Sequence, residues 1–240
     1  MASEYLKWKY RNEKPREHKE LTPAEKRKNW WHYHKWHVVG GVVLVFLAVS
    51  LLCQMLGIGQ IKPDYQFAYV AQSALPDETA AALETELAKL GTDQNGDGRV
   101  VVCVNQYPLA SSDPQLVMAF QVKLMADLSE SKSTFFLLDD PEEFQKDYQM
   151  LCRLDGSLPE DGDSSAEGTY YLWDDCPILA GLDLGAYSLE LIGEEALGDS
   201  NEVMRGIAVA RRGFWSEEDA PYPEGCAALW NAMTAGAAAP

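Results

Sequence analysis

The longest apolar run in the chain is VVGGVVLVFLAVSLLCQMLGIGQI, residues 38–61, and it contains no charged residue. As an α-helix a run of this length extends about 36 Å, which is enough to cross a hydrocarbon core of about 30 Å. A cleavable signal peptide is disfavoured, because the basic segment before the run is long and no A-x-A-like site follows. Thr22, Pro23 and Glu25 match a helix start with a capping box. The pattern predicts one uncleaved transmembrane helix, preceded by a short helical segment.

Residues 64–154 show short apolar runs that alternate with amphipathic segments. DYQFAYVAQ, RVVVCVNQY and STFFLLDD are rich in β-forming residues and predict strands over 64–72, 99–107 and 133–140. PDETAAALETELAKLG, DPQLVMAFQVKLMADLS and PEEFQKDYQMLCRL predict helices over 76–91, 113–129 and 141–154. This β-α-β-α-β-α order predicts an α/β fold, a three-layer outer domain with a mostly parallel sheet flanked by helices.

The last third of the chain is less regular. A polar acidic loop occupies residues 156–168. After it, TYYLWDD, AYSLELIG and VMRGIAVARR resemble strands, and GCAALWNAMTAG resembles a terminal helix. We therefore expect a tail, a span, an acidic α/β domain and a frayed end, over residues 1–37, 38–61, 62–234 and 235–240.

Charge is distributed unevenly over these segments. Residues 1–37 carry ten Lys/Arg and five Glu, a net charge of +5, whereas residues 62–240 carry ten Lys/Arg and 32 Asp/Glu, a net charge of −22. The positive-inside rule places the N-terminus in the cytoplasm and the acidic domain outside the cell membrane. The negative charge of this domain repels phosphate backbones, so nucleic acid is excluded as a partner.

The stretch NWWHYHKWH, residues 29–37, stands directly before the apolar run and holds three of the four histidines. On a helix His34 and His37 nearly share a face, but His32 points elsewhere, which disfavours a metal site. Trp and Tyr rings collect at membrane interfaces, and a Lys side chain extends to the headgroups. We therefore expect an aromatic juxtamembrane collar formed by Trp30, Trp31, Tyr33, Lys35 and Trp36.

The outer segment contains no histidine. This excludes Ser-His-Asp and Cys-His catalysis and the HExxH zinc proteases from it. Ser129 and Lys132 match the bare S-x-x-K of some serine acyltransferases, but no SDN or KTG motif follows. We interpret this match as chance.

DQNGDG places Asp93, Asn95 and Asp97 at positions 1, 3 and 5 of a calcium-type loop, with Gly98 at position 6. The bidentate Glu expected at position 12 is replaced by Val104, which disfavours a complete EF-hand. The alternative is a tight turn that leads into a strand. Calcium at this loop is the one cofactor left open by the sequence.

Two acidic groups are candidates for acid–base work. Asp139, Asp140, Glu142 and Glu143 follow a predicted strand, at the end where ligands bind in parallel sheets, and Asp174 with Asp175 forms a second group. The alternative is that these acids stabilise helix N-termini. Only burial that separates their pKa values would favour catalysis.

RRGFW places two cations beside two aromatic residues in an otherwise acidic domain. Such a group can bind an anionic ligand or a protein partner, and the alternative is a strand end whose arginines pair with nearby carboxylates. The candidate ligand or partner surface comprises Arg211, Arg212, Phe214, Trp215, Asp174 and Asp175.

TPAEKRKNWWHYHKWH, one span and then KPDYQFAYV together resemble small, uncharacterised membrane-anchored proteins of Gram-positive anaerobic bacteria, in which a YYKWH-like stretch precedes the helix. Residues 64–154, with VMAFQVKLMADLS and STFFLLDDPEEFQ, are similar to one lobe of extracellular solute-binding proteins. The 179 residues after the span are short for two such lobes, and no ligand residue is carried over from this resemblance.

These observations together favour a bacterial single-pass membrane protein whose outer domain binds, senses or scaffolds. A carboxylate-based hydrolase and an accessory subunit of a membrane complex are the alternatives, the latter with a membrane protein partner. The sequence does not define a small-molecule ligand. Four outer cysteines allow free thiols or one or two disulfides, and the sequence leaves this open for Cys103, Cys152, Cys176 and Cys226.

Overall fold

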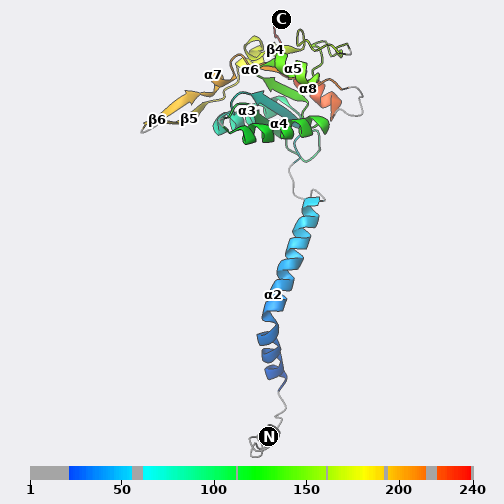
Figure 1. Ribbon diagram of the computed structural model, residues 1–240, viewed down its shortest axis with the longest axis vertical. Coiled ribbons are helices and arrows are strands. Elements are labelled where there is room, and N and C mark those ends of the chain that lie inside the picture. Colours follow the sequence, from blue (N-terminus) through cyan, green and yellow to red (C-terminus); the bar gives the residue numbers. More distant parts are fainter. Residues whose placement is uncertain are drawn as a thin grey trace, which may run out of the picture. The chain divides into compact units, whose positions relative to one another are not determined.

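The computed structural model describes residues 22–55, 62–111, 113–160, 162–191, 194–214 and 221–238. Two compact units divide the chain, Met1–Gln60 and Ile61–Pro240. The first contains helix α2, Pro23–Met55 (Figure 1), which includes a segment long and apolar enough to cross a membrane, with a mean hydropathy of 2.3. The last residues of the predicted span, 56–61, lie outside the described part of the chain.

The start of α2 is fixed by the capping box that the sequence predicts. Thr22 donates to Glu25 Oε2 through both its backbone N–H and its hydroxyl, each over 2.9 Å. Glu25 N–H donates back to Thr22 Oγ1 over 3.4 Å. The bond from the Thr22 backbone is the main cause that lowers the pKa of the Glu25 carboxyl. These reciprocal bonds satisfy free donors at the helix N-terminus.

The second unit is built on a five-stranded sheet of order β2-β1-β3-β7-β4. The strands are β1 Tyr65–Ala71, β2 Val102–Pro108, β3 Phe135–Leu138, β4 Tyr170–Leu172 and β7 Ala208–Arg211. Strand β1 is parallel to both β2 and β3, while β7 is antiparallel to β3 and to β4. The predicted mixed α/β fold with a mostly parallel sheet is confirmed.

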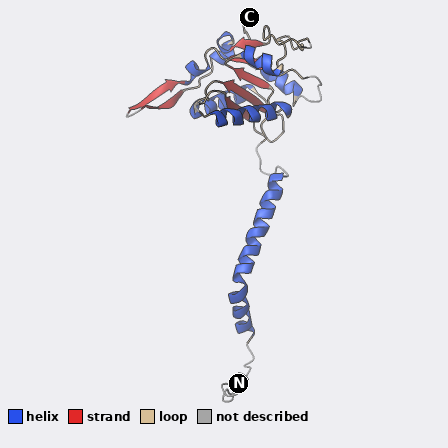
Figure 2. Ribbon diagram, in the orientation of Figure 1, coloured by secondary structure: helices blue, strands red, loops and turns tan. Residues whose placement is uncertain are grey.

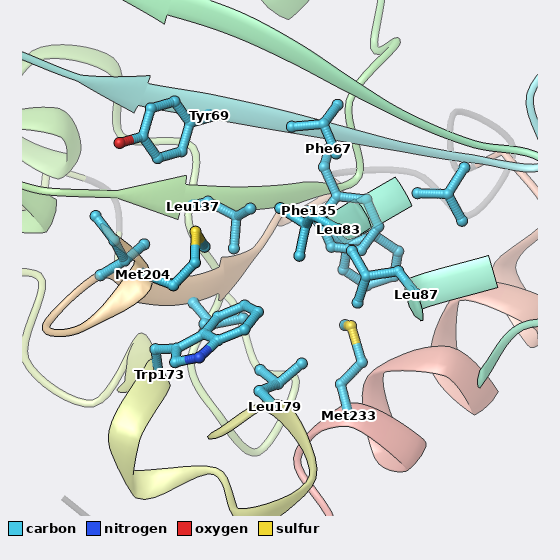
Figure 3. Packing of buried hydrophobic residues seen from close by; sticks show 14 of the residues in the cluster. Phe67, Tyr69, Leu83, Leu87, Phe135, Leu137, Trp173, Leu179, Met204 and Met233 are labelled. Atoms are coloured by element: carbon cyan, nitrogen blue, oxygen red, sulfur yellow. The ribbon is translucent and has the colours of Figure 1, made fainter. Parts of the chain in front are cut away.

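Helices cover both faces of this sheet (Figure 2). Helices α3 Asp77–Leu90, α6 Pro177–Ala180 and α8 Pro223–Met233 pack on one face, together with the short 3-10 helix η1 Trp173–Asp175. Figure 3 shows the core between them, where Leu83, Phe135 and Met233 meet. Helices α4 Pro114–Ser129 and α5 Pro141–Tyr148 cover the other face, through buried Leu124, Leu128 and Phe144.

A two-stranded ribbon leaves this core. Strand β5, Ala186–Leu191, pairs antiparallel with β6, Glu194–Asp199, and the ribbon extends away from the five-stranded sheet (Figure 1). Helix α7, Ser200–Met204, follows it and returns the chain to the core, where Thr79 Oγ1 and Ser200 Oγ lie 2.8 Å apart in a buried contact.

Several predicted boundaries are wrong for identifiable reasons. The strand expected over 99–107 begins only at Val102, because Val101 N–H donates to the carboxylate of Asp64 instead of extending the strand. The helix expected over 141–154 stops at Tyr148, where Gln149 adopts a left-handed conformation. Beyond it, Leu151 forms a β-bridge to Arg212 and is buried. In both places a tertiary contact overrides the local pattern.

All five cysteines are free thiols. Burial raises the pKa of the Cys176 thiol to about 11 and is also the main cause that raises the pKa of Cys103, Cys152 and Cys226. At neutral pH these four thiols are therefore protonated, and they behave as small apolar side chains of the second unit.

Candidate functional site

The two arginines singled out by the sequence line one cleft of about 130 Å³. Arg211 ends strand β7 and Arg212 directly follows it, while Phe135 begins the neighbouring β3 and Thr134 directly precedes it. Antiparallel pairing sets this register, with Phe135 opposite Arg211 and Arg212 N–H donating to Thr134 O over 2.8 Å. The start of α8 closes the cleft through Pro223, Cys226 and Ala227.

Arg211 is held against an aromatic ring and a backbone carbonyl. Its guanidinium carbon lies 5.3 Å from the ring centroid of Trp230, and its NH2 group donates to Leu154 O over 3.3 Å. Its Nε is buried and has no hydrogen-bond partner among the described residues. The ring fixes the direction of the charge while leaving guanidinium donors for other groups.

Arg212 is oriented in the same way on the other side of the strand end. Its NH2 group donates to Leu128 O over 2.7 Å, and its guanidinium carbon lies 5.4 Å from the ring centroid of Phe214. Phe214 lines the cleft as well. Trp215, the last residue of the predicted group, lies outside the described residues.

Within the part of the chain that the structure describes, Arg211 forms no ion pair. The ion pairs formed within the described residues join Lys89 to Glu86, Lys132 to Asp127 and Glu130, Arg153 to Asp163, and Arg205 to Glu202. Arg211 contributes to the lowered pKa of Asp155, although the Ser157 hydroxyl is the main cause there. Residues 62–240 carry 32 acidic residues. The guanidinium of Arg211 is nevertheless positioned by a backbone carbonyl and an aromatic ring.

The acidic candidates lie in two other clefts. Asp139 and Asp140 line one of about 200 Å³ at the carboxyl ends of β1 and β3, where Gln72 N–H donates to Asp139 over 2.6 Å and Asp140 caps α5. Asp175 lines one of about 430 Å³, and Asp174 accepts a bond from Gly206 N–H over 2.9 Å. All four carboxylates are exposed. Neither pair gathers buried acids, and Asp174 and Asp175 do not line the arginine cleft.

In the loop predicted as a partial calcium site, the side-chain oxygens accept hydrogen bonds from backbone N–H groups of the same loop. The Asp93 carboxylate accepts from Gly96 N–H over 2.6 Å and from Gly98 N–H over 2.7 Å, and the latter bond is the main cause that lowers the pKa of Asp93. Asn95 and Asp97 accept from the amides two residues further on. Among the described residues no three acidic, histidine or cysteine side chains are grouped to hold a metal. Calcium binding stays a prediction.

The carboxylate of Asp64, which no sequence motif marked, is buried and holds this loop in place through hydrogen bonds. Asp64, only 3% exposed, accepts from Gln94 N–H, Asn95 N–H and Val101 N–H over 2.8, 3.0 and 2.8 Å. It precedes β1, so its position ties the loop to the central strand of the parallel part. The only sign of this role in the sequence is that Asp64 is the first residue of the strand predicted over 64–72.

The remaining motifs form local contacts. In α2, His34 Nδ1 lies 2.9 Å from Trp30 O, and the two rings stack with centroids 5.0 Å apart. The collar rings of Trp30, Trp31, Tyr33 and Trp36 are exposed on the helix. In the S-x-x-K match, Ser129 donates to its own helix, and a hydrogen bond to Glu130 is the main cause that raises the pKa of Lys132. A lysine kept protonated in this way is a poor general base.

The arginine cleft is therefore the site that the fold assembles from the sequence candidates, within a mixed α/β domain. Its other walls, Thr134, Phe135 and Cys226, come from segments far away in the chain, and no motif marks them. Comparisons of the whole chain with known protein families, with curated proteins and with solved structures find no match.

Proposed function

We propose that this protein is a membrane-anchored binding module whose outer domain takes a small organic anion in the arginine cleft. The observation that carries the proposal is the guanidinium of Arg211, which is held over Trp230 and forms no ion pair within the described residues. Planar guanidinium donors match the two oxygens of a carboxylate.

The walls of the cleft define the kind of anion. Phe135, Phe214 and Pro223 are apolar, while Thr134 and the two arginines are polar. A ligand with a carboxylate at one end and a short apolar or aromatic body at the other fits this division. The volume of about 130 Å³ restricts it to a small molecule. The exposed carboxylates elsewhere on the domain support binding rather than carboxylate-based hydrolysis.

Replacing Arg211 with alanine is expected to weaken carboxylate binding about 10- to 150-fold, the loss of about 1.5–3 kcal/mol for a hydrogen bond to a charged group. The measurement is calorimetric titration of the full chain in detergent with benzoate, and with benzamide as the neutral analogue. Benzoate binds to the unsubstituted chain and benzamide does not. The affinity also falls with salt, because the partners carry opposite charges.

Arg205→Ala is the matched control, since this arginine is exposed and pairs with Glu202 on α7 away from the cleft. It leaves benzoate binding unchanged. Equal binding of benzoate and benzamide, or equal affinities of the Arg211→Ala chain and the unsubstituted chain, contradicts the proposal.

Anchoring with the N-terminus inside is the second part of the proposal. It is supported by the apolar segment in α2 and by the ten basic residues before the span. In intact cells an amine reagent that does not cross the membrane is expected to modify exposed Lys89 and to spare Lys28 and Lys35, as read by peptide mass spectrometry. If the reagent instead modifies Lys28 and Lys35 and leaves Lys89 unmodified, the orientation is the opposite of the one proposed.

A further inference from the structure

Strand β4 is the last strand in the order of the five-stranded sheet, so one of its edges is open. Directly after β4, Trp173 N–H donates to Ile207 O over 2.8 Å. Bonded and non-bonded residues alternate along an antiparallel ladder, so the backbone N–H and C=O groups of Tyr170 and Leu172 point away from β7. Among the described residues, none forms a hydrogen bond with these outward groups.

The opposite edge of the sheet, formed by β2, is partly covered by a side chain. Val104 N–H, which does not bond to β1, donates to the carboxylate of Glu84 on α3 over 2.8 Å. An open strand edge is a template for pairing with another chain, and covering it with a neighbouring helix prevents this. Strand β4 is therefore the edge at which an added strand finds free backbone groups.

A cleft of about 430 Å³ follows this open edge. Tyr170, Tyr171 and Leu172 all line it, although successive side chains of a strand point to opposite faces of the sheet. A cleft lined by three consecutive strand residues runs along the edge of the strand and is not confined to one face. An extended peptide has the shape that fits such a cleft.

The charge of the cleft favours a basic ligand. Glu142, Glu167 and Asp175 line it and are exposed, and the described lining contains no Lys or Arg. None of the three carboxylates forms an ion pair with another described residue. The rings of Tyr170 and Tyr171 provide aromatic faces, which attract cations.

We propose that an extended basic segment of a partner protein adds to the open edge of β4. Its main chain forms hydrogen bonds with the outward groups of Tyr170 and Leu172. Glu142 belongs to α5 on one face of the sheet and Asp175 to η1 on the other, so Lys or Arg side chains on either face of the added strand meet a carboxylate. The arginine cleft is lined by other residues, so the two sites are independent.

Leu172→Pro tests the main-chain contact. The φ of Leu172 is −77°, which suits proline, and its N–H lies outside the ladder with β7, so the sheet is retained while one outward donor is lost. Leu172→Ala is the control, because it loses the same side chain and keeps the N–H. Fluorescence polarisation measures binding of a labelled peptide of alternating Lys and Val to the full chain in non-ionic detergent. Leu172→Pro is expected to bind about 3- to 10-fold more weakly than Leu172→Ala, the contribution of one backbone hydrogen bond.

Glu167→Gln combined with Asp175→Asn tests the charge. This double variant is expected to weaken peptide binding about 2- to 10-fold, the range for two exposed ion pairs. Asp77→Asn combined with Glu78→Gln removes the same charge from exposed positions on α3 and leaves binding unchanged. A peptide of alternating Glu and Val does not bind. Equal affinities of the two double variants would show that the cleft does not select a basic partner.

Equal affinities of Leu172→Pro and Leu172→Ala overturn the proposal. Displacement of the peptide by lysine amide at the same concentration also overturns it, since a single cation would then suffice. If Leu172→Pro has a lowered melting temperature, the same peptide with methylated backbone nitrogens decides on the unsubstituted chain: weaker binding supports the added strand, and unchanged binding contradicts it. Benzoate affinity of Leu172→Pro stays unchanged, so failure here is distinct from failure of the anion site.

Discussion

Replacing Asp64 with alanine is expected to lower the free energy of unfolding of the second unit, Ile61–Pro240, by about 3 kcal/mol, at about 1 kcal/mol for each backbone donor that loses its acceptor. The Asp64 carboxylate accepts from three amides that lie 30, 31 and 37 residues further along the chain. Alanine leaves these N–H groups facing a buried position without an oxygen. The melting temperature is expected to fall by about 6–12 °C, at about 2–4 °C per kcal/mol for a domain of this size.

Asp97→Ala is the control from the same loop, because its carboxylate is exposed and accepts a single amide, that of Arg99. Water replaces the lost oxygen there, so the expected change is below about 1 kcal/mol. Asp64→Asn keeps one acceptor oxygen and falls between the two. Chemical denaturation followed by circular dichroism gives all three values. Equal losses for Asp64→Ala and Asp97→Ala would show that the loop does not depend on the buried carboxylate.

The parts of the fold that follow from local chemistry could be predicted from the sequence. The β-forming run before Ala71 and the amphipathic helix that ends at Leu90 have the expected bounds within one or two residues. The reciprocal Thr22–Glu25 bonds were readable from three residues of spacing. Strand β6 was not predicted, because EEALGD is polar and its pairing with β5 supplies the order that its own residues do not.

Only those residues of the candidate site that lie close together in the sequence could be predicted. Arg211, Arg212 and Phe214 are adjacent in the sequence, so their unusual chemistry is visible without a structure. Their partners Phe135 and Trp230 reach the site through pairing of β3 with β7 and packing of α8, which join segments separated by many residues. The same limit applies to α4, in which Leu124 is buried and Val122 is exposed, since a sequence with apolar residues on both sides of a helix does not say which side the sheet covers.

Replacing Trp230 with alanine is expected to cost about 3–5 kcal/mol of unfolding free energy, the range for removal of a buried aromatic side chain. Trp230 is 3% exposed. Its ring centroid lies 6.4 Å from that of Phe135, nearly parallel to it, and 6.2 Å from that of Tyr171. The ring thus joins α8 to two strands of the sheet, and its loss opens a cavity at the point where Arg211 is held.

Trp230→Phe separates packing from recognition. Phenylalanine retains an aromatic face, so most of the stability is expected to remain, while the weaker attraction to Arg211 lowers benzoate affinity by a few-fold, corresponding to about 0.5–1 kcal/mol. Asn231→Ala, exposed on the same helix, controls for changes in helix propensity and is expected to be neutral. Denaturant titration measures stability and calorimetry measures binding. A loss for Trp230→Ala no larger than that for Asn231→Ala would mean that α8 is not held to the sheet through this ring. Unchanged benzoate affinity in Trp230→Phe would show that stacking on Trp230 does not orient Arg211 for the anion.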